Sequence, residues 1–565
     1  MLAKEPKRES GVKSRIAPAQ YTGISGALMR YIIFVLAIAV SAAAQIQEIS
    51  GERIRAHVKF LSSDLLEGRG VGTRGGDLAT EYIATQFALS GAKPAGDNGT
   101  YFQNVPLIGV ETQPDAQLSA AGKKGTLPLQ WRTEFVGVNL RQKPLEEFEA
   151  EAVFVGHGIV APEFQWDDFK GVDVRGKILV LFTNEPASSD EKFFGGRALT
   201  YYGRWTYKYE QALRKGALGA VIIHTTPTAG YGWQVVRNSW AREDVYVRLK
   251  PGEPELAFAG WVTETAGEKL LAMAGRSVPE LLKLSDSRAF KPIPLGIRIR
   301  GRMASKVREI NTRNVAAIVR GSAPALASEA VIFSAHWDHL GIGTPVNGDN
   351  IYNGAADNAT GCGIVLEMAR FWASLEQKPR RSAIFLAVTA EEGGLRGTDY
   401  YATHPFIPAG KTALALNFDG FHPWGRTKDV VLNGADRTTF WPQVQEAAQR
   451  MNLAIRPDPE PEQGSYYRSD HFSFARAGIP AFSVDMGEEF LGKPQGYGRK
   501  MLDEYEAKQY HMPSDEYRED WDFSGLEHIA RFGFLLGQSA ANLEELPTWN
   551  AGDEFLAARQ KSGVR

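Results

Sequence analysis

From about Arg308 onward, the sequence alternates short apolar runs with helical patterns, and this alternation limits the folds open to the chain. Strands are predicted for NVAAIVRG, EAVIFSAH, RSAIFLAVTA, TALALNFD and IPAFSVDMG. Helices are predicted for GIVLEMARFWASL, TFWPQVQEAAQRM and LEHIARFGFLLGQSAANL. Strands that are apolar throughout are typical of a parallel sheet covered by helices on both faces. The predicted fold class is therefore α/β, with a three-layer α/β/α domain around a mostly parallel central sheet.

The rest of the chain has other patterns. Two amphipathic helices are predicted in IRAHVKFLSSDLLEG and DLATEYIATQFALSGAKPAG, on either side of a glycine-rich loop. The short β-branched runs EAVFVGHGIV, GKILVLF and GALGAVIIHTT predict a small β-rich domain with one or two helices. The predicted organisation is an N-terminal extension at 1–44, the α/β domain at 45–111 and 293–546, a β-rich insertion at 112–292 and a loose polar tail at 547–565.

Composition narrows the classes of function. The 565 residues exceed what one hydrophobic core usually holds, so two or more domains are expected. The net charge of −2 gives no reason to expect nucleic acid or an anionic membrane as a partner. Cys362 is the single cysteine, so no intrachain disulfide forms and any metal ligands must be His, Asp or Glu. Such ligands suit zinc, manganese or cobalt.

The N-terminus has the features of a secretory signal. Met29 and Arg30 precede the apolar run YIIFVLAIAV and the small residues SAAAQ, which predicts cleavage after Ala44. The apolar run is short for a membrane span, so no stable span is expected after cleavage, and an uncleaved N-terminal membrane anchor is the alternative. Met29 is an alternative start to Met1. The protein is therefore expected to be periplasmic or secreted.

Five side chains of metal-ligand type stand in the C-terminal half: His336, Asp357, Glu392, Asp419 and His511. Three of them follow predicted strands, at the edge where open α/β sheets bind ligands. Each has an ordinary alternative role, such as a helix N-cap for Asp357 or a turn for Asp419. As a set they suit a two-metal hydrolase, whose ions lie about 3.5–4 Å apart.

Neighbouring residues extend the candidate site. Asp338 is predicted to orient His336 by accepting the second N–H of its ring. Glu391 stands beside the candidate ligand Glu392, and it is predicted to take a proton from an attacking water. His339 and His404 have no such setting and are predicted to be structural.

The candidate residues lie in the segments AHWDHLG, GAADNATG, AVTAEEGGLRGT, LNFDGF, YYRSDHFSFARAGIPAFS and YHMPSDEY. In this order, the segments resemble the motifs of the di-zinc metallopeptidase family that includes bacterial leucyl aminopeptidase and glutamate carboxypeptidase II. EGRGVGTRGG resembles the family's N-terminal opening. VGHGIVAPEFQWDDFKGVDVRGKILVLF resembles a protease-associated domain, which this family often carries as an insertion.

The resemblance implies roles for the candidate residues. One zinc would be held by His336 and Asp419 and the other by Glu392 and His511, with Asp357 bridging them; Mn²⁺ or Co²⁺ are alternatives. Asp338 would orient His336, and Glu391 would be the general base. A cis peptide bond is expected between Asp357 and Asn358. Tyr510 would stabilise the oxyanion, with Tyr466 or Tyr467 as alternatives.

The implied function is a zinc-dependent exopeptidase, foremost an aminopeptidase acting on short peptides. A carboxypeptidase or dipeptidase acting on acidic or N-acylated peptides is the second interpretation, with Arg396, Arg468 or Arg499 binding a carboxylate. A receptor-like homologue without catalysis and a one-zinc acyltransferase resembling glutaminyl cyclase are further alternatives. The insertion would cover the cleft, or else serve as a spacer or a homodimer surface.

Overall fold

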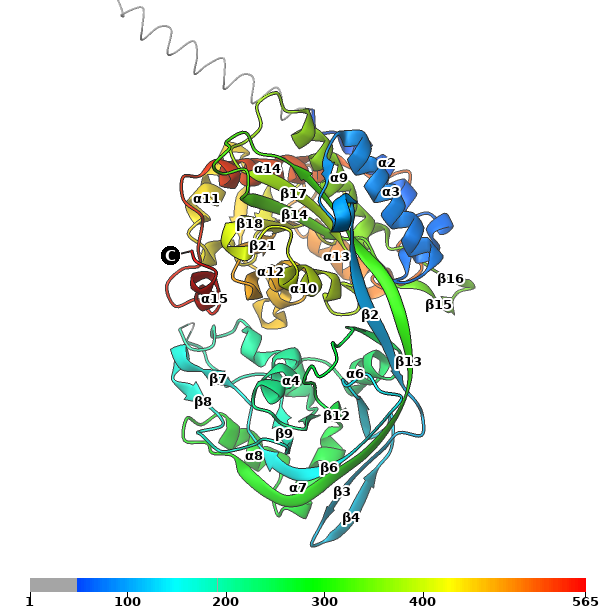
Figure 1. Ribbon diagram of the computed structural model, residues 1–565, viewed down its shortest axis with the longest axis vertical. Coiled ribbons are helices and arrows are strands. Elements are labelled where there is room, and N and C mark those ends of the chain that lie inside the picture. Colours follow the sequence, from blue (N-terminus) through cyan, green and yellow to red (C-terminus); the bar gives the residue numbers. More distant parts are fainter. Residues whose placement is uncertain (1–47, 191, 565) are drawn as a thin grey trace, which may run out of the picture. The chain divides into compact units, whose positions relative to one another are not determined.

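The five apolar runs of the C-terminal half form neighbouring strands in one sheet (Figure 1). In spatial order they are β21 (Ala481–Ser483), β18 (Thr412–Asn417), β14 (Ala330–His336), β17 (Ser382–Val388) and β13 (Ile293–Val319). β14 is parallel to β17 and β18, and β18 is parallel to β21. β13 is antiparallel to β17. The predicted mixed α/β fold with a mostly parallel central sheet is confirmed.

Helices cover both faces of this sheet. Successive residues of a strand point to opposite faces, so neighbouring residues of β14 contact different helices. Phe333 of β14 packs on Trp372 of α9 (Thr360–Ser374) and lies against Gly537 of α14 (Ser524–Asn542). Its chain neighbour Ile332 belongs instead to the apolar cluster that contains Tyr401 of α10 (Arg396–Thr403) and residues of α12 (His471–Arg476). The sheet is therefore the middle layer of three.

The computed structural model describes residues 48–190 and 192–564, and the described residues from Ile49 onward form one compact unit. The predicted signal peptide and its cleavage site lie outside the described residues. Among the helices that are described, none is long and apolar enough to cross a membrane.

Two N-terminal helices pack beside α9, as their apolar spacing predicts. α2 (Gly51–Leu61) buries Ile54 and Val58 against Gly363 of α9. α3 (Arg74–Ser90) is capped at its N-terminus by Thr73, whose hydroxyl accepts a hydrogen bond from the Gly76 amide, and at its C-terminus by Gly91, which is in the left-handed conformation.

The segment 112–292 contains a second set of strands. β6 (Leu145–Phe154), β9 (Ile178–Phe182), β10 (Gly219–Ile223) and β12 (Phe258–Val262) are parallel in that order, and β5 (Phe135–Val138) is antiparallel to β12. Its described residues hold five α-helices, against the one or two helices predicted: α4 (Trp205–Arg214), α5 (Thr226–Ala229), α6 (Trp233–Trp240), α7 (Glu264–Met273) and α8 (Val278–Ser285).

The long strand β13 joins the two sets of strands, and Figure 1 shows it as a long curved arrow. One end pairs with β17 and with β2 (Phe102–Thr112), and the other pairs with β3 (Gln117–Gly122) and β6. β11 (Asp244–Val247) pairs with β2. A strand from the segment 112–292 thereby lies at the edge of the sheet that carries the candidate site.

The prediction of a loose tail is wrong. Residues 547–564 include α15 (Leu556–Lys561), and Trp549 and Arg559 are fully buried. The Trp549 indole N–H donates to the Gly478 oxygen, and the Arg559 guanidinium donates to the oxygens of Pro547 and Ala409. Because this segment is mostly polar in composition, its sequence did not indicate that these two side chains are buried.

Further strands and longer helices complete the described part of the chain. They are β1 (Lys93–Pro94), β4 (Gly125–Leu129), β7 (Val160–Ala161), β8 (Trp166–Asp167), β15 (Gly341–Val346), β16 (Asp349–Tyr352), β19 (Asp429–Val431), β20 (Ala454–Arg456), β22 (Asp485–Met486), α11 (Trp441–Arg450) and α13 (Tyr497–Lys508).

Candidate metal centre

The parallel strands deliver candidate ligands to one edge of the sheet. His336 is the last residue of β14, Glu392 follows the end of β17, and Asp419 follows the end of β18. Asp357 lies in the turn of π-helix that precedes α9, and His511 lies just after α13. Their convergence follows from the parallel topology, since parallel strands end at the same edge.

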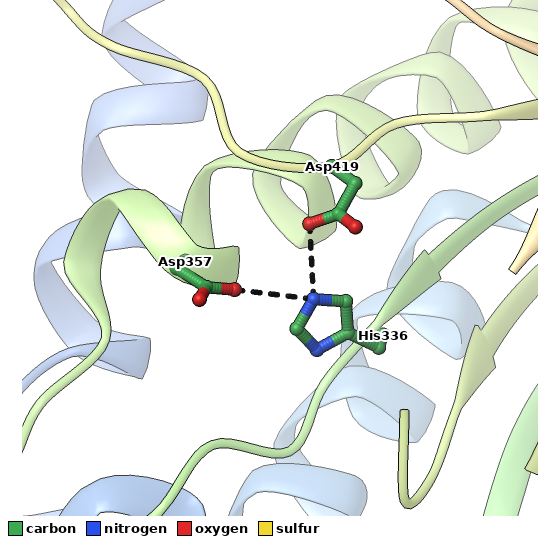
Figure 2. A group of neighbouring side chains, drawn as sticks. All are labelled: His336, Asp357 and Asp419. Carbon is green, nitrogen blue, oxygen red and sulfur yellow. Dashed lines mark hydrogen bonds and ion pairs between the residues drawn. The ribbon is translucent and has the colours of Figure 1, made fainter. Parts of the chain in front are cut away.

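His336, Asp357 and Asp419 form the first half of the cluster (Figure 2). The His336 Nε2 lies 3.0 Å from Asp419 Oδ1 and 3.2 Å from Asp357 Oδ1. Ligand atoms bound to one tetrahedral zinc at about 2.0–2.1 Å are about 3.3 Å apart. The three side chains are therefore spaced as ligands of one cation.

Glu392 and His511 form the second half, and Asp357 takes part in both. The His511 Nε2 lies 3.1 Å from Glu392 Oε2 and 3.3 Å from Asp357 Oδ2. Asp357 thus presents Oδ1 to one half and Oδ2 to the other. The structure brings together all five ligand candidates that the sequence predicts.

Buried polar atoms without partners test whether cations fit here. Asp338 Oδ2, Glu392 Oε1 and both ring nitrogens of His339 have no hydrogen-bond partner within the described part of the chain. Buried polar atoms are usually paired, and an unpaired one is costly. Carboxylate oxygens and imidazole nitrogens are also the atoms that bind zinc. The donor set therefore fits divalent cations.

Two buried residues hold the loops of the site. The Arg69 guanidinium donates to the main-chain oxygens of Trp337 and Gly354. The Asp515 carboxylate accepts the amide hydrogens of Ala356 and Asp357. Sequence reasoning gave neither residue a role, although EGRGVGTRGG and YHMPSDEY contain them. The Asp357–Asn358 peptide bond is cis, as the resemblance implies.

Asp338 contacts His336 differently from the prediction. The His336 Nδ1 lies 3.1 Å from the main-chain oxygen of Asp338, so the carboxylate is not its partner. The carboxylate oxygen Oδ1 instead accepts the Glu391 amide hydrogen at 3.2 Å. Burial raises the pKa of Asp338 to about 6. Its side chain therefore supports the loop that carries Glu391.

Tyr510 is the tyrosine best placed of the three considered. Its ring stacks on the His511 ring with centroids 4.0 Å apart, and its side chain is about half exposed. Tyr466 and Tyr467 are buried, and their hydroxyls donate to the Ala481 oxygen and to Glu554. Both of the alternative hydroxyls are thus engaged elsewhere.

His339 lies in the second half of the cluster, although it was predicted from the sequence to be structural. Its Nδ1 lies 2.7 Å from Glu392 Oε1 and 3.9 Å from Asp357 Oδ2. His404 stacks on Tyr400 and hydrogen-bonds within α10, as a structural histidine would. His339 is the second histidine of AHWDHLG, and its place three residues after the candidate ligand His336 was the signal that could have indicated it.

Two cavities adjoin the cluster. One, of about 930 Å³, opens at Asp419 and Gly420. The other, of about 560 Å³, reaches Glu392 and Gly393, and α4, α6 and β11 of the segment 112–292 supply much of its wall. A substrate therefore has room on both sides of the cluster.

A parallel α/β sheet with carboxylates and imidazoles gathered at the ends of its strands defines a candidate metal-dependent hydrolase. Residues 314–533 match the family model of Peptidase family M28.

Several solved structures are similar to this chain. The aminopeptidase from Aneurinibacillus sp. strain AM-1 is 20% identical over 89% of this chain and 96% of its own, with a TM-score of 0.48. BSAP, a zinc aminopeptidase from Bacillus subtilis, is 16% identical over 90% and 99%, with a TM-score of 0.40. A peptidase M28 precursor from Shewanella amazonensis SB2B is 18% identical over 88% and 98%, with a TM-score of 0.38.

Proposed function

We propose that the protein is a secreted or periplasmic zinc-dependent exopeptidase that removes N-terminal residues from short peptides. The observation that carries the proposal is the convergence of His336, Asp357, Glu392, Asp419 and His511 into two halves that share one carboxylate. This cluster lies within the segment that matches a peptidase family.

His336 and Asp419 would hold one zinc, Glu392 and His511 the other, and Asp357 would bridge them. When bound, such cations polarise a carbonyl and make water more acidic. Ser469 donates a hydrogen bond to Asp419 Oδ2 at 2.6 Å, which fixes the other carboxylate oxygen. Mn²⁺ or Co²⁺ would suit the same donor atoms.

Glu391 is the proton carrier in this proposal. It takes a proton from the attacking water as the new C–O bond forms, and it gives that proton to the amide nitrogen as the C–N bond breaks. Burial raises the pKa of Glu391 well above its usual range, with Asp419 and Asp470 adding to the shift, and this favours proton uptake. The Tyr510 hydroxyl would donate a hydrogen bond to the oxyanion.

An acidic cavity supports the choice of an aminopeptidase. The cavity at Asp419 is lined by twice as many acidic as basic side chains. Two of the basic ones are already ion-paired, Arg456 with Glu489 and Arg499 with Asp503. Because an excess of carboxylates attracts a positive charge, this wall suits the free amine of a peptide.

A carboxylate-binding exopeptidase is the second candidate, and one pair of arginines favours it. Burial and the charge of nearby Arg468 lower the pKa of Arg204 to about 10. Neither guanidinium has an acidic partner within the described ranges, and the Arg204 Nε is buried without a hydrogen bond. Arg468 precedes Ser469, the residue bound to Asp419. A terminal carboxylate would suit this pair.

Peptide cleavage with and without a free amine separates the two candidates. We expect hydrolysis of an aminoacyl p-nitroanilide and no hydrolysis of its N-acetylated form. Prolonged chelation should abolish this activity and added zinc should restore it. Without the cations, the proposed site has no group that polarises the peptide carbonyl. Preference for the acetylated peptide would favour the second candidate. Full activity in protein verified to be metal-free would refute both.

A further inference from the structure

His339 is a buried imidazole that sequence reasoning did not use. Its exposed fraction is 2%, and both ring nitrogens lack a hydrogen-bond partner among the residues described. An imidazole that is only packed in a core usually bonds through at least one nitrogen. Its surroundings therefore need an explanation beyond packing.

The ring lies among groups that bind cations. Nδ1 lies 2.7 Å from Glu392 Oε1, the carboxylate oxygen that does not face His511. His339, Asp357 and Glu392 offer ligand atoms that all lie within 4.8 Å of one another. The ring centroid of His511 is 5.7 Å away. Imidazole nitrogen and carboxylate oxygen atoms gathered this closely are suited to share a cation.

The backbone makes room for this ring. Gly354 has φ +58°, and a Cβ at that position would lie 2.5 Å from the His339 Cγ. The His339 amide donates to the Arg69 oxygen, and the Arg69 side chain donates to the Gly354 oxygen. The glycine and the arginine together keep the ring against Glu392.

We propose that His339 is a third imidazole of the metal centre and binds, through Nδ1, the cation held by Glu392 and His511. The inference rests on the proposed function, because it assumes that a cation binds there. The first half keeps one imidazole, that of His336, so the two halves differ in ligand number. The cation at Glu392 and His511 is therefore the more fully coordinated of the two.

Cation binding to the full chain tests this assignment apart from activity. The variants are His339→Phe, which keeps the ring volume, and His339→Ala, with His404→Phe as the matched control. Each metal-free protein is titrated with Zn²⁺ against a chromophoric chelator, and bound metal is counted after gel filtration. Near-ultraviolet circular dichroism of the metal-free proteins checks folding, so that either His339 variant serves if the other misfolds.

The wild type and the control should bind two equivalents. Both His339 variants should bind one equivalent as tightly and the second about 10–100-fold more weakly, since even residues outside the ligand set cost that much. With saturating Co²⁺, the visible spectrum of the variants should differ from that of the wild type because the number of ligands changes.

Three other results would overturn the inference or its basis. Two unchanged equivalents in a folded variant would remove His339 from the centre and leave the proposed function intact. Weaker binding with an unchanged Co²⁺ spectrum would make it a positioning residue for Glu392, against the ligand assignment. No cation bound by the wild type would reject the proposed function itself.

Discussion

Glu391 and Glu392 are adjacent, but the fold gives their carboxyl groups opposite pKa shifts. Burial and the charges of Asp419 and Asp470 hold the pKa of Glu391 well above its usual range. Burial also acts to raise the pKa of Glu392, but the nearby imidazoles of His511 and His339 outweigh it and lower that pKa to about 2. Neighbouring carboxyl groups whose pKa values are shifted in opposite directions are suited to different roles. Glu392 is suited to stay charged as a ligand and Glu391 to exchange a proton.

This difference predicts the effect of single substitutions. Glu391→Gln removes the proton acceptor and keeps the shape, so kcat should fall by about 10²–10⁴-fold. Its metal content should remain that of the wild type, as measured by metal analysis. Glu392→Gln is the matched control, and it should lose metal as well as activity. Normal kcat in Glu391→Gln would show that another group carries the proton.

At the scale of elements, the sequence predicted those parts whose apolar pattern is local. The strands β14, β17 and β18 were found because they are apolar throughout, and their parallel order then placed His336, Glu392 and Asp419 at one edge. Arg69 and Asp515 were missed because their partners are main-chain groups distant in sequence. Contacts of this kind leave no periodic pattern.

The loop after β17 is held by a strand from the segment 112–292. The Arg396 Nε donates to the Val245 oxygen at 2.8 Å, and its guanidinium lies over the Tyr246 ring at 4.8 Å. A Cβ on Gly393 would lie 2.2 Å from Val245 Cγ2, so the loop and β11 pack closely. The Arg396 side chain, a sequence candidate for binding carboxylate, is thus engaged in holding this loop.

Loss of this contact should loosen the loop that carries Glu391. Arg396→Ala is expected to lower kcat about tenfold, which corresponds to about 1.4 kcal/mol, with little change in metal content. Arg396→Lys should restore only part of the loss, because an ammonium lacks the planar fork that bonds and stacks together. Steady-state kinetics on a free-amine peptide measure both. A raised KM with unchanged kcat would instead indicate that Arg396 binds substrate.

At the scale of the molecule, hydrogen bonds connect the C-terminal segment with a loop of the candidate metal centre. The Glu554 carboxylate accepts hydrogen bonds from the Tyr467 hydroxyl and from Arg437. Tyr467 lies two residues before Ser469, which bonds to Asp419. Sequence reasoning missed this connection because one buried tryptophan and one buried arginine carry the packing of a segment that reads as polar.

Trp549 should therefore be a major source of stability for the whole chain. Its side chain is 1% exposed, its ring packs 5.1 Å from that of Phe555, and its indole N–H donates to the Gly478 oxygen. Trp549→Ala leaves a cavity and an unpaired acceptor, so it should lower the free energy of unfolding by about 3–5 kcal/mol. Chemical denaturation of the full chain measures this loss, and Gln560→Ala, an exposed position in α15, is the control that should change little. Equal stability of the two variants would mean that the tail is not anchored by its tryptophan.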